Sequence, residues 1–192
     1  MIDTERHEAL AIGGSAGSLP VVIDLLAELA ADTALVVVLC LHMGRSRAGD
    51  MARVLGRRCA LPVSEAGERQ RLAPGHVYFA AGGYHLLVER DRRFALCAGE
   101  RVNFVRPAID ILFESMADAY RDGLAGMLLS GANADGASGL EYIQRLGGLT
   151  LVQSPNSAMA AQMPSAALDL FTPDRVHDPM GLGQAVRALS RS

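Results

Sequence analysis

The chain has 192 residues, half of them hydrophobic, and a formal net charge of −3. This length predicts one domain, and the slightly acidic balance gives no support for nucleic-acid binding. Its three cysteines are odd in number and unpatterned, which favours a reducing compartment over a disulfide framework or a zinc site. A charged N-terminus and the lack of a long apolar run argue against a signal peptide and against membrane insertion. We therefore expect a soluble, cytoplasmic protein with no cofactor and no metal.

The first elements expected are a strand, a tight turn and a helix, all beginning within Ala9–Pro20. Apolar residues at helical spacing continue this helix over Leu19–Ala30. Leu35–Leu41 is a continuous apolar run, which is typical of a strand buried on both faces of a parallel sheet. Strand, helix and strand in this order predict a right-handed βαβ unit. A short helix at Ala48–Arg57 and a short strand at Leu61–Val63 follow.

The next stretch interrupts the alternation of strands and helices. His76–Ala80 and His85–Glu89 flank the turn residues Ala81-Gly82-Gly83-Tyr84, a pattern that predicts a β-hairpin. Arg93–Ala98 is expected to add a third antiparallel strand. We therefore expect a small antiparallel hairpin extension of the sheet.

The second half returns to alternating helices and strands. The elements expected there are a helix at Pro107–Tyr120, a strand at Gly126–Leu129, a helix at Ala137–Leu146, a strand at Leu149–Val152, a helix at Ser165–Leu170, a strand at Arg175–His177 and a helix from Leu182. The whole pattern predicts an α/β fold, a doubly wound and mostly parallel sheet with helices on both faces. We expect a single domain over residues 1–192.

The turn within the first βα unit carries the first chemical signal. Gly13-Gly14-Ser15-Ala16-Gly17 fits G-x-S-x-G, the pattern that holds a nucleophilic serine on a sharp strand-to-helix turn. The helix N-terminus would favour a developing oxyanion. A glycine-rich turn at this place also serves as a phosphate cradle or as a plain structural turn. On the turn alone, all three interpretations stay open.

Three residues of a nucleophile, base and orienter set follow predicted parallel strands. Ser15, His42 and Asp135 each stand directly after, or in the loop after, such a strand. The carboxyl ends of parallel strands share one edge of the sheet, so we expect these side chains to lie together. Asp135 could equally cap the helix that follows it. Asp110 is a rival acid, but it lies inside a predicted helix, where packing or a salt bridge is expected.

Several motifs in a fixed order resemble the catalytic domain of the CheB chemoreceptor methylesterase family. The resemblance runs from about residue 8 to residue 190. The stretches that carry it are the turn Ala11–Gly17, the strand Val36–His42, the segment Arg106-Pro107-Ala108-Ile109-Asp110, the loop Leu128–Gly139, and Gln162-Met163-Pro164.

This resemblance implies an esterase that removes methyl groups from γ-glutamyl methyl esters on chemoreceptors, with glutamine deamidation as a second activity in many members. Carried over by position, Ser15 is the nucleophile, His42 the general base and acid, and Asp135 its orienter. Methylated chemoreceptor cytoplasmic domains are the implied partners, and a separate regulatory protein is kept open as another. Oxyanion donors and active-site loop residues are expected among Ala16, Gly17, Gly131, Ala132 and Asn133. Substrate contacts are expected at Arg106 and at Met163, beside Met159. A structural ion pair of Arg106 and ordinary packing of the two methionines stay open as alternatives.

The chain departs from the family pattern at two places. Ser15-Ala16-Gly17-Ser18 replaces Ser-Thr-Gly-Gly, and Gly131-Ala132-Asn133 replaces Gly-Met-Gly. Asn133 would reshape its loop if that position needed a positive φ. The receiver domain usual in the family does not precede this domain, so we expect a stand-alone protein.

Two further functions stay open beside the esterase. One is a catalytically weak relative that acts as an interaction module in a signalling pathway. The other is a nucleotide-binding protein, which would leave His42 and Asp135 without a role. Five arginines after His42 also suggest a basic rim that attracts an acidic receptor, or simply a solvated helix face: Arg45, Arg47, Arg53, Arg57 and Arg58.

Overall fold

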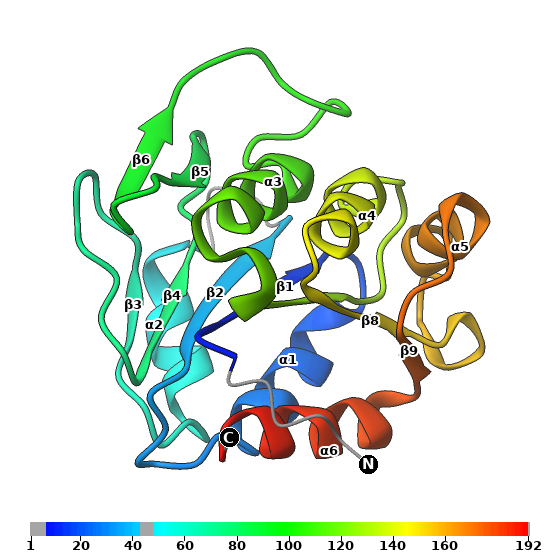
Figure 1. Ribbon diagram of the computed structural model, residues 1–192, viewed down its shortest axis with the longest axis horizontal. Coiled ribbons are helices and arrows are strands. Elements are labelled where there is room, and N and C mark those ends of the chain that lie inside the picture. Colours follow the sequence, from blue (N-terminus) through cyan, green and yellow to red (C-terminus); the bar gives the residue numbers. More distant parts are fainter. Residues whose placement is uncertain (1–6, 43–47, 192) are drawn as a thin grey trace.

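A computed structural model describes residues 7–42 and 48–191, and its centre is a seven-stranded sheet in the order β3-β4-β2-β1-β7-β8-β9. Every neighbouring pair in this sheet is parallel. Helices cover both faces (Figure 1). The α/β fold expected from the sequence is confirmed. The strands are β1 (Ala9–Gly14), β2 (Val36–Leu41), β3 (Val63–Glu65), β4 (His76–Phe79), β7 (Leu124–Leu128), β8 (Leu149–Gln153) and β9 (Arg175–His177).

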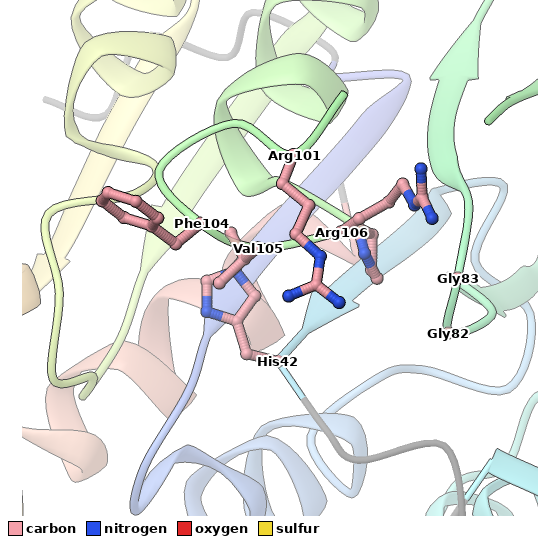
Figure 2. A pocket seen from close by; sticks show the side chains of 8 residues that line it. His42, Gly82, Gly83, Arg101, Phe104, Val105 and Arg106 are labelled. Carbon is pink, nitrogen blue, oxygen red and sulfur yellow. The ribbon is translucent and has the colours of Figure 1, made fainter. Parts of the chain in front are cut away.

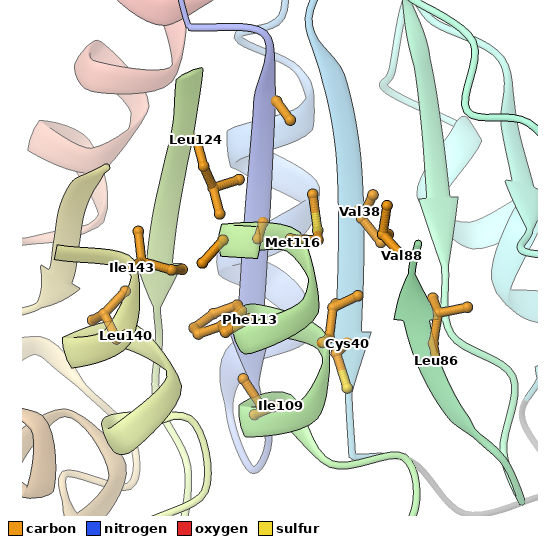
Figure 3. Close-up of a cluster of buried hydrophobic side chains, with 14 of the residues drawn as sticks. Val38, Cys40, Leu86, Val88, Ile109, Phe113, Met116, Leu124, Leu140 and Ile143 are labelled. Atoms are coloured by element: carbon orange, nitrogen blue, oxygen red, sulfur yellow. The ribbon is translucent and has the colours of Figure 1, made fainter. Parts of the chain in front are cut away.

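Two apolar clusters occupy the two faces of the sheet. Alternate residues of β1 belong to different clusters: Ala9 and Ala11 to one, Leu10 and Ile12 to the other. The first cluster lies under α3, α4 and α5, and the second lies against α1, α2 and α6. Figure 3 shows α3 lying across the central strands in the first cluster. The helices are α1 (Ser18–Leu26), α2 (Ala48–Gly56), α3 (Ile109–Tyr120), α4 (Ala137–Arg145), α5 (Gln162–Leu170) and α6 (Pro179–Leu189).

The hairpin expected around Ala81–Tyr84 is wrong. β4 lies inside the main sheet, paired in parallel with β2 on one side and β3 on the other. Both of its edges are therefore taken, and the next strand cannot pair with it. That strand, β5 (His85–Val88), pairs instead with β6 (Phe94–Cys97) in a separate two-stranded antiparallel sheet that lies against α3. The turn expected at Arg90–Arg92 does join these two strands.

Several helices begin or end away from their expected positions. α1 ends at Leu26, four residues before the predicted end, and α5 begins at Gln162, three residues early. α6 begins at Pro179, where the Asp178 side chain accepts a hydrogen bond from the Gly181 N–H at 2.8 Å. An aspartate cap followed by proline is an ordinary helix start that hydrophobic periodicity alone does not reveal. None of the helices in the described residues combines the length and the hydropathy required to cross a membrane.

Candidate active site

The register of the central strands brings Ser15 and His42 to neighbouring positions. Gly14 of β1 pairs with Leu41 of β2, and the His42 N–H donates to the Gly14 carbonyl at 3.0 Å. On the other side of β1, the Ser15 N–H donates to the Ser130 carbonyl at 2.9 Å. Strand order reverses at β1, because β2 and β7 flank it. Sites in open α/β sheets form at such a switch point.

The turn after β1 has the geometry that the glycine pattern predicts. Gly17 lies in the left-handed region, with φ of 80°, and α1 begins at the next residue. The Ser18 hydroxyl donates to the Ser15 carbonyl at 2.7 Å, and Ser18 itself is buried. The serine that departs from the family pattern at position 18 therefore closes the turn. Ser15 stays half-buried beside the N-terminus of α1.

His42 is held from one side by a carboxylate. Its Nε2 lies 2.7 Å from Oδ2 of Asp135, whose side chain is fully buried. Nδ1 of the same ring is buried and has no hydrogen-bond partner among the described residues. An ionised carboxylate can only accept, so Nε2 carries the proton of a neutral ring and Nδ1 is left as an acceptor. Nδ1 is thus the nitrogen that can take a proton from another group.

Asp135 is held ionised by several donors. Its oxygens accept from the N–H of Ile109 at 2.7 Å and from the N–H of Asp110 at 3.2 Å, in addition to His42. Burial alone would raise the pKa of Asp135, but the hydrogen bonds from His42 and from the two amides outweigh it and hold the pKa below its ordinary value. The helix that Asp135 caps is α3. The expectation that it caps the following helix, α4, is wrong.

Asp110 caps α4 in return. Its Oδ1 accepts from the N–H groups of Gly136 at 2.9 Å and Gly139 at 2.8 Å. Burial, with the negative charge of Asp135 as a further contribution, raises the pKa of Asp110 to about 6. His42 donates its hydrogen bond to Asp135, so Asp110 is not the acid that holds the imidazole. The structural role expected for Asp110, packing or a salt bridge, takes the form of burial and hydrogen bonds to the backbone.

Asn103 joins these two carboxylates, although no sequence motif indicates this role. Its Nδ2 donates to Oδ2 of Asp110 at 3.2 Å and lies 3.5 Å from Oδ1 of Asp135. The residue belongs to a loop without hydrophobic periodicity or a recognised motif. The tight turn between Val102 and Val105 places it beside the paired N-termini of α3 and α4.

The loop after β7 is tied to the turn that bears Ser15. The Ser130 hydroxyl donates to the Ala16 carbonyl at 2.7 Å and accepts from the Ala160 N–H at 2.9 Å. The Gly131 N–H donates to the Ala160 carbonyl at 3.0 Å, so it is already used within the protein. The N–H groups of Ala16 and Gly17 make no hydrogen bond to the described residues. Ser130 is a further residue of the site that motif reasoning did not single out.

Asn133 does not need the strained backbone that a glycine would have allowed. It is not among the residues with positive φ, and its Oδ1 accepts from the Asp135 N–H at 3.2 Å. This short turn fixes the backbone from which the Asp135 side chain extends. The departure at this position is therefore compatible with the local structure.

A pocket of about 520 Å³ opens beside His42 (Figure 2). Its lining includes Arg101 and Arg106. Arg106 donates through one guanidinium nitrogen to the carbonyls of Ala98 at 2.8 Å and Gly99 at 2.6 Å. The side chain thus fixes a loop of the site through backbone carbonyls rather than through an ion pair.

Met163 is not exposed to a substrate. It is fully buried and lies directly against Gly131, where an added Cβ would come within 2.5 Å of its methyl carbon. The expectation of a substrate contact at Met163 is wrong, because its side chain fills the space under the loop. Met159 lies at the surface instead, 85% exposed and against Gly17.

The described residues include only part of the basic rim. Arg45 and Arg47 lie outside the described residues. Among the others, Arg53 forms an exposed ion pair with Asp50, and Arg58 forms one with Asp24.

A sequence profile of the CheB methylesterase family matches residues 10–186. The chain belongs to the CheB methylesterase family. A Leptospira interrogans protein, named provisionally as a protein-glutamate methylesterase/protein-glutamine glutaminase, is 41% identical over 171 residues, which are 89% of each chain. A protein of Hydrogenovibrio crunogenus with that name is 32% identical over 88% of this chain and 46% of its own length. This CheB-type chain therefore spans about half the length of such longer relatives.

The fold is also found in a solved structure. The CheB methylesterase catalytic domain of Thermotoga maritima superposes with a TM-score of 0.90, covering 95% of this chain and 98% of that one. The sequences are 24% identical, so this likeness concerns the fold.

Proposed function

We propose that this CheB-family protein is a serine hydrolase that cleaves γ-glutamyl methyl esters on chemoreceptors. The observation that carries the proposal is the short hydrogen bond between His42 and Asp135 next to the turn that bears Ser15. Membership of the family and the names of its relatives support the ester as substrate. Hydrolysis of an ester requires a nucleophile, a general base and a general acid. Ser15 can serve as the nucleophile, and His42, oriented by Asp135, can serve as base and then as acid.

In this mechanism, the Ser15 hydroxyl attacks the ester carbonyl carbon while Nδ1 of His42 takes the hydroxyl proton. The Asp135 carboxylate stabilises the imidazolium that forms. The imidazolium then gives its proton to the departing methoxy oxygen, so methanol leaves and an acyl-enzyme on Ser15 remains. Water attacks this acyl group with His42 again as base, which yields a glutamate carboxylate and restores Ser15.

The oxyanion of each tetrahedral intermediate needs donors that other groups do not already use. Ala16 and Gly17 supply two N–H groups without partners among the described residues, at the N-terminus of α1. Ala132 and Asn133 are secondary candidates from the facing loop. Removal of a single oxyanion donor typically lowers turnover by about two to three orders of magnitude.

The same acyl-enzyme would form from a glutamine side chain, with ammonia as the leaving group. The relatives that carry the glutaminase name support this second activity. We place the reaction in the cytoplasm, on the cytoplasmic domains of methylated receptors, with regulation by a separate protein.

The test is methanol release from a methylated receptor fragment. Wild type is expected to release methanol, and Ser15→Ala is expected to release none above the uncatalysed rate. Ser165→Ala, a change of the same kind on α5, serves as the control and should match wild type. Equal release by Ser15→Ala and wild type would eliminate Ser15 as nucleophile.

A catalytically weak interaction module is the competing proposal, since Ala16 replaces the family's threonine beside Ser15. Receptor binding without methanol release by wild type would favour it.

A further inference from the structure

The pocket beside His42 contains positive charge and no acidic lining residue. It measures about 520 Å³, and its walls come from His42, the Gly82–Gly83 turn and the segment from Arg101 to Pro107. In the view of Figure 2, the Arg101 guanidinium extends into the space between His42 and Gly82–Gly83. The chain as a whole carries a net charge of −3, so this local excess of arginine runs against the overall balance.

Neither arginine of the pocket forms an ion pair with a carboxylate of the described residues. Arg101 is exposed and has no hydrogen-bond or ion-pair partner among the described residues. Among the described residues, Arg106 donates hydrogen bonds only to backbone carbonyls, and its buried Nε has no hydrogen-bond partner. Other arginines of the chain do have such partners, as in the pairs Arg92–Glu8 and Arg58–Asp24.

The nearest buried acids are already engaged. Asp135 is bonded to His42 and to two amides at the start of α3, and Asp110 is bonded to two amides at the start of α4. The two carboxylates therefore interact with the helix N-termini and with the His42 imidazole. The two guanidinium groups therefore have no counter-ion among the described residues, and an anion from outside the protein can fill this role.

The segment that carries Arg101 is fixed. Val102 and Val105 exchange two backbone hydrogen bonds, of 3.2 and 2.9 Å, around Asn103 and Phe104. Both central residues have positive φ, 51° and 66°, as a tight two-residue hairpin turn requires. The Asn103 side chain anchors this turn to Asp110. The turn also places Phe104, 93% exposed, at the pocket wall.

We propose that this pocket binds a carboxylate of the substrate protein, on an acidic side chain close to the residue that carries the methyl ester. The proposal rests on the proposed esterase function. The ester itself is neutral and needs no cation, whereas guanidinium groups match carboxylates in charge and geometry. Arg101 is the specificity residue, and Arg106 adds charge from a fixed position. The enzyme therefore selects esters with an acidic neighbour.

The experiment uses synthetic helical peptides with one glutamyl methyl ester each. In one series, a glutamate lies one, three or four residues before or after the esterified residue. In the matched series, methionine replaces this glutamate. The quantity compared is the ratio of kcat/KM for the acidic peptide to that for the neutral one, from methanol release. Wild type should prefer the acidic peptide by about 10-fold at one or more positions, and added salt should reduce the ratio.

Arg101 is the residue to change because, unlike Arg106, it holds no other part of the described chain. Arg101→Gln should bring the ratio close to 1. Arg101→Glu should reverse it and favour a peptide with lysine at the same position. Arg90→Gln removes an equally exposed charge from the β5–β6 turn, outside the pocket, and should keep the wild-type ratio.

The outcomes separate the two proposals. A ratio of 1 at every position in wild type, or a ratio that Arg101→Gln leaves intact, would overturn the carboxylate pocket while esterase activity stands. Failure of wild type to hydrolyse any of the peptides would overturn the esterase function and, with it, the pocket's assignment.

Discussion

His42 is oriented so that its Nε2 meets Asp135, and Nδ1 is the nitrogen that takes the Ser15 proton in the proposed mechanism. The more familiar arrangement of such triads uses the ring the other way, with Nε2 toward the serine. The chemistry does not depend on which nitrogen is used, because each can accept a proton when the other donates to the carboxylate. What matters is that Asp135 stays ionised, and its donors keep its pKa low.

Asp135→Asn is expected to lower kcat by about four orders of magnitude. The asparagine oxygen is expected to stay where Oδ2 accepts from Nε2 and from the Ile109 N–H. The neutral amide, however, no longer stabilises the imidazolium that forms when His42 takes the Ser15 proton. Methanol release measures the effect, and Asp118→Asn, an exposed change of the same kind, is the control. An Asp135→Asn enzyme with more than a tenth of wild-type turnover would contradict this role.

The sequence predicts those residues of the candidate site that follow a strand. Ser15, His42 and Asp135 could be named because the carboxyl ends of parallel strands meet at one edge. Asn103 and Arg101 could not, because their position depends on a tight turn in a loop without periodicity. Met163 was misplaced because sequence does not separate a methionine at the surface from one that fills the core.

At the scale of elements, α3 and α4 cap each other's N-termini. Asp135 precedes α4 and bonds to the first amides of α3, while Asp110 lies in α3 and bonds to amides of α4. Two carboxylates are thus brought close together inside the protein. Like charges disfavour joint ionisation, and the less strongly bonded acid, Asp110, has the raised pKa.

The pKa of Asp110 gives stability a specific pH dependence. In the unfolded chain this group ionises near 3.8, and in the folded protein at about 6. The folded state therefore holds the proton more tightly, and its free energy of unfolding falls as pH rises from about 4 to 6. The free energy of unfolding falls by about 3 kcal/mol at most, and this decrease is complete above pH 6.

Asp110→Asn should remove this contribution, since asparagine keeps an oxygen for the two glycine N–H groups but does not titrate. Urea unfolding of both proteins at pH 4.5 and pH 7 measures it. The stability of wild type relative to the variant should fall between the two pH values, and carboxylates distant from Asp110 cancel in the comparison. An unchanged difference would show that Asp110 has an ordinary pKa.

Most elements were predictable from hydrophobic patterns, and the errors have a physical cause. Turn residues at Ala81–Tyr84 indicate that the chain reverses, but not which strand edge is available for pairing. β4 has both edges filled, so β5 pairs with β6. Local sequence also fixes helix ends poorly where a cap, such as Asp178, decides the start.

At the scale of the whole molecule, one central sheet joins two apolar clusters. β1 supplies alternate side chains to both, and it pairs with β2 and β7 in the middle of the sheet. Loss of this strand would expose both clusters at once. The two faces therefore cannot unfold independently.

We expect urea to unfold the domain in one transition. Far-ultraviolet circular dichroism reports the backbone, and near-ultraviolet circular dichroism reports the packed tyrosines Tyr78 and Tyr120, both of the first cluster. The two midpoints should coincide. Separate transitions would show that the clusters are independent units.

We propose that Ser15 is a nucleophile activated by His42. A fluorophosphonate tests it directly, because an activated serine oxygen displaces fluoride and forms a stable bond to phosphorus. Mass spectrometry of the digested protein should place one label on the peptide that contains Ser15. His42→Ala should label at least about 100-fold more slowly, and Ser15→Ala should not be labelled there. A label on another serine, such as Ser130, or labelling of Ser15 at an unchanged rate in His42→Ala, would show that Ser15 is not a nucleophile activated by His42.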